Sequence, residues 1–127
     1  MQKIENFTNA VSQLLQAAKI YGSSPEDELY RDGLIQRFEF TVELAWKSLK
    51  EYLEDQGTVL AVTTPRAVLK EAYAAGIIFN EIEWNAILTA RNLTSHVYDE
   101  ATAKKISSQI CNDFLPVLCS LANFYQQ

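Results

Sequence analysis

Residues with side chains suited to acid–base and phosphate chemistry are concentrated in one short run, residues 91–98. Arginine presents a fixed fork of N–H donors that matches phosphate oxygens, asparagine adds a neutral donor, and histidine exchanges a proton near neutral pH. Arg91, Asn92 and His96 are therefore candidate catalytic residues for metal-independent RNA cleavage. His96 would act as general acid or base at a ribose hydroxyl, and Arg91 would stabilise the phosphorane charge. Tyr98 could polarise a nearby group or be modified itself.

The spacing of these residues constrains how a site could form. On a continuous α-helix the seven-residue spacing puts Arg91 and Tyr98 on one face. The four-residue spacing puts Asn92 and His96 on another face, and Arg91 is separated from His96 by about 140° around the axis. A helix break near residue 94 or 95 would bring the four side chains together, and a dimer could align two copies across a symmetry axis.

A purely structural role is the alternative for the same residues. His96 is the only histidine, and a lone histidine near a helix boundary often caps the helix or forms a hydrogen bond. Arg91 could form a solvent-exposed ion pair with Asp99 or Glu100, and Tyr98 could pack into the core. Residue type and spacing alone leave the catalytic and structural interpretations open.

Apolar residues three and four positions apart predict the helices that must carry this segment. The expected ranges are 4–21, 26 to about 56, a short helix from 65 to about 75, and 81 to about 93. A last helix is expected to begin at either Thr94 or Asp99 and to continue through Leu121. Pro116 should kink it, because proline cannot donate the helical hydrogen bond.

Several residues indicate where these helices begin and end. Gly22 and Gly57 are expected to end the first and second helices, and Ser24-Pro25 is expected to begin the second. Gly33 should offset or kink the first turns of that helix, since glycine lowers helix propensity by about 1 kcal/mol relative to alanine.

The third and fourth helices have their own start signals. Thr64, followed by a proline, is a typical N-cap for the third helix. For the fourth helix, Asn80 and Glu83 have the spacing of a capping box, and Phe79 and Trp84 have the spacing of a hydrophobic staple.

The net charge limits the classes of partner. With 11 Lys and Arg against 16 Asp and Glu, the chain carries −5, so a broad nucleic-acid-binding surface is not expected and any RNA contact should be local. Acidic residues on the second helix lack a Glu-x-x-His partner, and Cys111 and Cys119 lack zinc-ligand spacing. The cysteines are expected to be buried free thiols, and no metal or cofactor is expected.

The composition predicts the fold class. The 127-residue chain is 48% hydrophobic and 21% charged, an ordinary globular balance that can build a core without disulfides. The polar N-terminus and the lack of a long apolar segment predict a soluble cytoplasmic protein with no membrane association. We therefore expect one all-α domain over residues 1–127, an up-and-down four-helix bundle with a short additional helix.

Local pattern suggests roles for two further pairs of residues. Trp46 and Trp84 lie at helical core positions and are expected to be core or interface anchors. Tyr30 and Arg31 lie beside Gly33 and could line a cleft there.

Residues 91–98 are similar to the Arg-polar-x3-His signature of the HEPN superfamily, in its extended Arg-x4-His-x-Tyr form. The wider chain resembles the nucleotidyltransferase substrate-binding subunits. Segments 38–47 and 64–72 support this resemblance, as does Trp84 ahead of the signature, and together the similarity covers about residues 5–125.

This resemblance implies a bundle that forms a homodimer and has a separately encoded minimal nucleotidyltransferase as its partner. It implies a toxin ribonuclease of a toxin–antitoxin pair, with Arg91 and His96 catalytic. The antitoxin would transfer AMP from ATP to Tyr98. The added phosphate, two residues from His96, would then repel and block RNA. The alternative that the family allows is a non-catalytic subunit that holds substrate for the nucleotidyltransferase.

Overall fold

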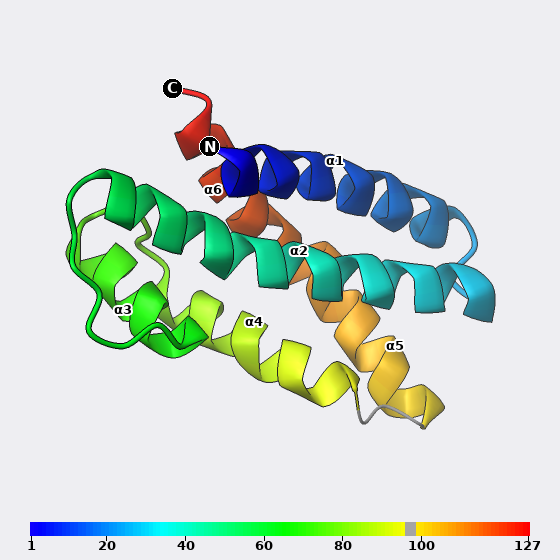
Figure 1. The fold of residues 1–127 in the computed structure, drawn as a ribbon. Coiled ribbons are helices and arrows are strands. Elements are labelled where there is room, and N and C mark those ends of the chain that lie inside the picture. The colour runs from blue at the N-terminus through cyan, green and yellow to red at the C-terminus, as the bar shows by residue number, and fades with distance from the viewer. Residues whose placement is uncertain (96–98) are drawn as a thin grey trace.

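The computed structural model describes residues 1–95 and 99–127, and every element in that part of the chain is helical (Figure 1). The elements are α1 (Gln2–Ser23), α2 (Glu28–Asp55), α3 (Pro65–Ala74), α4 (Glu81–Thr94), α5 (Glu100–Gln109), the π-helix η1 (Ile110–Phe114) and α6 (Leu115–Tyr125). None of these described helices has both the length and the apolar character to cross a membrane. The predicted all-α bundle is confirmed, with α3 as the short additional helix.

Helix α2 is the element against which the others pack. α1 lies antiparallel beside it, α4 runs along its other side, and the helix formed by α5, η1 and α6 crosses behind it and ends near the N-terminus of α1 (Figure 1). Their apolar faces meet in one core. Its largest fully buried side chains are Phe7, Leu14, Leu34, Phe38, Leu49, Leu53, Ile87, Ile110 and Leu118.

The start of α2 differs from the sequence prediction. α1 continues through Gly22 to Ser23, and the Asp27 carboxylate accepts a hydrogen bond from the Tyr30 backbone N–H at 3.0 Å. The first helix thus ends within the predicted stretch 22–25, but Ser24 is its C-cap in place of Gly22, and the predicted start of α2 at Ser24-Pro25 is wrong. Aspartate is as strong an N-cap as serine. α2 also passes through Gly33 without a break, because burial of the residues that follow outweighs a weak local propensity.

The other helix ends agree with the prediction in part. Gly57 has a φ of +90°, a conformation that suits glycine, and it follows the end of α2 as expected. The Thr64 hydroxyl accepts a hydrogen bond from the Ala67 backbone N–H at 3.3 Å, which confirms the predicted cap of α3. Asn80 occupies the N-cap position of α4, but its side chain makes no capping hydrogen bond. Phe79 stays 75% exposed, so the expected staple is wrong.

The kink predicted at Pro116 takes the form of a π-helical turn. η1 lies directly before α6, and Pro116 is in the first turn of α6. Because proline lacks an N–H and its ring crowds the preceding turn, a locally wider turn relieves both problems. Cys111 and Cys119 are free as expected but only half-buried, and burial raises the pKa of both thiols.

Candidate functional site

The helix break predicted in the chemical segment is confirmed. α4 ends at Thr94, whose hydroxyl donates to the Arg91 carbonyl at 2.7 Å, and the Ser95 hydroxyl donates to the Asn92 carbonyl at 3.2 Å. These side chains satisfy carbonyls that lose their partners when a helix ends. His96 and Tyr98 lie outside the described residues, so their predicted roles stay predictions.

Asp99 begins the next helix, which decides between the two starts left open by the sequence. Its carboxylate accepts hydrogen bonds from the Thr102 hydroxyl and the Thr102 backbone N–H, each at 2.7 Å. The hydrogen bond from the Thr102 hydroxyl does most to lower the pKa of Asp99, and the bond from the backbone N–H lowers it further. The alternative start at Thr94 is wrong, because Thr94 is buried in the last turn of α4.

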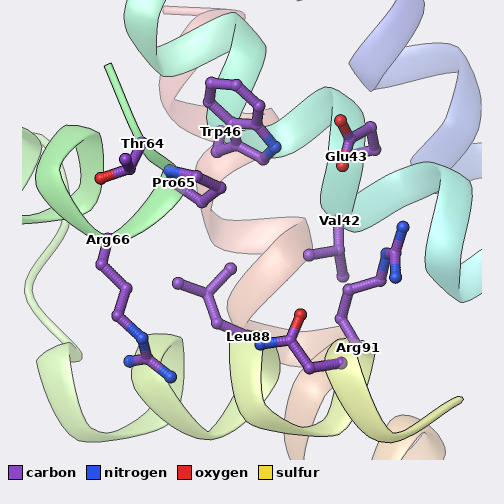
Figure 2. Close-up of a pocket in the computed structure, with 9 residues that line it drawn as sticks. Val42, Glu43, Trp46, Thr64, Pro65, Arg66, Leu88 and Arg91 are labelled. Atoms are coloured by element: carbon purple, nitrogen blue, oxygen red, sulfur yellow. The ribbon is translucent and has the colours of Figure 1, made fainter. Parts of the chain in front are cut away.

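Arg91 and Asn92 line a cleft between α2, the start of α3 and α4 (Figure 2). Its volume is about 380 Å³, near the lower end of the range for small-molecule sites. The residues that line it are Val42, Glu43, Trp46, Thr64, Pro65, Arg66, Leu88, Arg91 and Asn92. Arg91 and Asn92 are adjacent on α4 and point in different directions from its axis, yet the cleft is wide enough to take both. We call it the arginine cleft.

Arg91 has no carboxylate partner in the described part of the chain. Its Nε atom is buried and has no hydrogen-bond acceptor among the described residues. In the structural interpretation of the sequence, Arg91 was expected to form an ion pair with Asp99 or Glu100. Asp99 instead caps α5, and Glu100 lies 3.6 Å from Lys104. That alternative is therefore wrong for the described residues.

Arg66 holds one wall of the arginine cleft in place. Its Nη1 donates to the Asn85 side-chain oxygen at 3.0 Å, and its Nη2 donates to the Thr89 hydroxyl at 3.4 Å. These two bonds join the first turn of α3 to the middle of α4. Arg66 thus donates hydrogen bonds to other side chains, whereas Arg91 has no such partner among the described residues.

The opposite wall comes from α2. Glu43 lies 3.4 Å from Lys47, and the Lys47 ammonium lies 5.9 Å from the centre of the Trp46 ring. The Trp46 Nε1 atom is buried without an acceptor among the described residues. Trp84 is a core residue as predicted, at 3% exposure. Trp46 is half-buried and lines the cleft, a role that the sequence prediction missed.

The sequence held a signal for this wall. On α2, Trp46 lies four positions after Val42 and three after Glu43, so it neighbours both on the helix surface, and Leu88 on α4 has the same spacing to Arg91 and Asn92. Nothing local, however, indicates that the two faces oppose each other, and Arg66 comes from a third segment.

A second cleft of about 620 Å³ lies between the N-terminal half of α2 and the ends of α4 and α5. Arg31 lines it, as predicted, but Tyr30 does not. The Arg31 Nε lies 3.5 Å from Asp32, and the charged lining is otherwise acidic. The carboxylates that line it are Glu28, Asp32, Glu39, Asp99 and Glu100. We call it the acidic cleft.

Comparison with known proteins gives consistent matches over the chain. A family model described as "Nucleotidyltransferase substrate binding protein like" matches residues 2–127. A Haemophilus influenzae protein named "Probable ribonuclease HepT" is 37% identical over 90 residues, which are 65% of this chain and 58% of that protein. This chain thus matches less than two thirds of the length of that relative.

Two solved structures share the fold. One, from Haemophilus influenzae, is described as the fold of a substrate-binding domain of a nucleotidyltransferase; it has a TM-score of 0.86 and 28% identity over 98% of this chain and 99% of that one. The other, from Thermus thermophilus, has a TM-score of 0.80 and 28% identity over 95% of this chain and 99% of that one.

Proposed function

This chain belongs to the family of nucleotidyltransferase substrate-binding-like proteins, and we propose that within it the chain is a HEPN-type toxin that cleaves RNA without a metal ion. The observation that carries the proposal is Arg91. Its guanidinium lines an open cleft with Asn92 and has no carboxylate partner among the described residues, in a chain that is acidic overall. An uncompensated arginine of this kind suits a phosphate.

The proposed reaction is attack of a ribose 2′-hydroxyl on the neighbouring phosphate. His96 removes the hydroxyl proton, the new P–O bond forms as the bond to the 5′ oxygen breaks, and the leaving 5′ oxygen takes a proton from water. The arginine fork of Arg91 stabilises the negative charge that develops on the phosphorane, and the Asn92 amide donates a further hydrogen bond. The proposed acting unit is a homodimer.

The direct test is cleavage of RNA by the purified protein in the presence of a chelator. We expect His96→Ala and Arg91→Ala each to lower the rate by about 100-fold or more, the usual cost of losing a general base or an oxyanion donor. Equal rates for the wild type and both variants would contradict the proposal. Circular dichroism of each variant checks that the fold is kept.

The proposed regulation is adenylylation of Tyr98 by a minimal nucleotidyltransferase antitoxin. Family membership supports this partner, and the added phosphate would introduce negative charge two residues from His96. Mass spectrometry after incubation with the partner and ATP should find AMP on Tyr98 and none on Tyr98→Phe. Modification elsewhere on the chain would contradict the assignment of Tyr98.

A second candidate function is a non-catalytic subunit that holds substrate for the nucleotidyltransferase. The net charge of −5 favours it, as does the description of the Haemophilus influenzae structure. This candidate predicts a stable complex with the partner, no adduct on Tyr98 and no RNA cleavage. The same mass spectrometry and cleavage assays therefore separate the two functions.

A further inference from the structure

We infer that the arginine cleft is a pocket for one unpaired nucleobase of single-stranded RNA, next to the phosphate bound by Arg91. The inference rests on the proposed ribonuclease function and deepens it by naming the form of RNA that is recognised. The cleft volume of about 380 Å³ accommodates a single nucleotide. A duplex would need a broader basic surface than this acidic chain provides.

Two buried donors point to a ligand with acceptor atoms. The Trp46 Nε1 and the Arg91 Nε are both shielded from solvent, and neither has an acceptor among the described residues. Trp46 extends from α2 and Arg91 from α4, so the two side chains border the cleft from facing helices (Figure 2). Buried donors are nearly always paired. A nucleobase edge carries ring-nitrogen and carbonyl acceptors that would pair with these donors once the side chains that cover them move aside.

Pro65 offers an apolar surface to the flat face of a base, above a floor formed by two residues that are almost fully buried. Val42 and Leu88 are almost fully buried at 1% and 6% exposure, and Pro65 contributes a rigid apolar ring from the start of α3. Leu88 lies on the α4 side of the cleft, below Trp46 and Pro65 (Figure 2). Unpaired bases are typically recognised by packing on apolar, indole or guanidinium surfaces, combined with hydrogen bonds to their edges.

Side-chain hydrogen bonds distinguish the two arginines of the cleft. Arg66 is engaged by Asn85 and Thr89, and Glu43 is balanced by Lys47. Arg91 is thus the one arginine of the cleft wall with no described side-chain partner, at the end of α4 that leads to His96. The base would lie between α2 and α4, with its phosphate toward that end.

The test is a binding measurement that does not depend on turnover. The probes are a short single-stranded RNA that cannot be cut because it carries 2′-O-methyl groups, and copies that lack the base at each position in turn. Fluorescence anisotropy compares wild type with Trp46→Phe, which keeps an aromatic ring but removes the Nε1 donor. The matched control is Trp84→Phe, since Trp84 is the other tryptophan and lies in the core outside the cleft.

We expect one abasic position to weaken binding to the wild type, and Trp46→Phe to weaken binding of the intact RNA about tenfold, as for one lost hydrogen bond. Trp46→Phe should not change the affinity for that abasic RNA, because the base that Trp46 contacts is already missing. Trp84→Phe should behave as the wild type with both RNAs.

Three outcomes would overturn the inference. The first is an equal RNA affinity of the Trp46→Phe and Trp84→Phe variants. The second is that Trp46→Phe lowers the affinity for intact and for abasic RNA equally. The third is that free AMP or GMP binds through Trp46 while RNA does not bind. Failure of the proposed function has a different signature. In that case the wild type does not cleave unmodified RNA, while base-dependent binding through Trp46 is still measured.

Discussion

The arginine cleft and the acidic cleft share α2 and the last turns of α4 but have opposite chemistry. Arg91 and Asn92 line the first, and Thr94, two residues later, lines the second. Each cleft contains an arginine whose Nε is buried without a described hydrogen-bond partner. Arg31 lies 3.5 Å from Asp32 and is surrounded by carboxylates, whereas Arg91 has no carboxylate partner in the described chain.

This difference shows how an acidic chain can keep an arginine that has no carboxylate partner among its described residues. The net charge of −5 does not describe either cleft, because five carboxylates line the acidic cleft while Glu43, the carboxylate that lines the arginine cleft, lies 3.4 Å from Lys47. Charge attraction falls off within about 10 Å at moderate salt. The few groups lining a cleft therefore decide what it can bind.

The largest expected effect separates the two arginines. Arg91→Ala should lower the rate of RNA cleavage by about 100-fold or more, because it removes the proposed phosphorane contact. Arg31→Ala should change the rate by less than about threefold, since the Arg31 charge is already balanced. Cleavage rates measured with chelator present make the comparison, and similar losses for both variants would remove the distinction between the clefts.

Loss of Arg66 should loosen the arginine cleft. Arg66→Ala removes the hydrogen bonds to Asn85 and Thr89, and we expect it to lower the free energy of unfolding by about 0.5–1 kcal/mol, as these bonds are solvent-exposed. Urea denaturation measures this loss.

Arg37→Ala, which removes an exposed hydrogen bond from Arg37 to the Gln13 carbonyl outside the cleft, is the control for RNA affinity. Equal RNA affinity for the two variants would show that Arg66 does not support the cleft.

Asp99 should make the start of α5 sensitive to acid. Its folded-state pKa lies below the ordinary value of 3.8, so its stabilisation is fully present above that value. The stabilisation is lost as the pH falls through the lower folded-state pKa. Asp99→Asn should weaken the fall in melting temperature in this acidic range, and an unchanged pH profile would contradict the capping role.

The smallest effect is expected from the rim of the acidic cleft. Lys104 lies 3.6 Å from Glu100 and 3.7 Å from Glu26, with all three side chains substantially exposed. Lys104→Ala should change the free energy of unfolding by less than about 0.5 kcal/mol, because exposed ion pairs contribute little. A loss as large as that of Arg66→Ala would indicate a larger structural role for this rim.

The sequence predicted most of the fold because the relevant signals are local. Apolar periodicity located the helices. Gly57 marked the end of α2 and Thr64 the start of α3, and Asp99 proved to be the correct one of the two predicted starts of the last helix. The errors occurred where two local signals competed. Asp27 caps α2 in place of Ser24.

The candidate site was predicted only in part. The residue types of the 91–98 run indicated phosphate chemistry, and the structure puts Arg91 and Asn92 in one cleft. Trp46, Glu43 and Arg66 were missed as cleft residues. Their local pattern is that of an ordinary amphipathic helix and a helix start.

By itself, the sequence determined the helices, their apolar faces and the chemical character of residues 91–98, since these follow from side-chain type and from spacing along one segment. Only the tertiary structure decided that α2, the start of α3 and α4 form the arginine cleft. It also decided that Asp99 and Glu100 lie with the acidic cleft, away from Arg91. The physical reason is that a cleft is formed by helix faces from distant segments, and the packing of the whole core sets which faces meet.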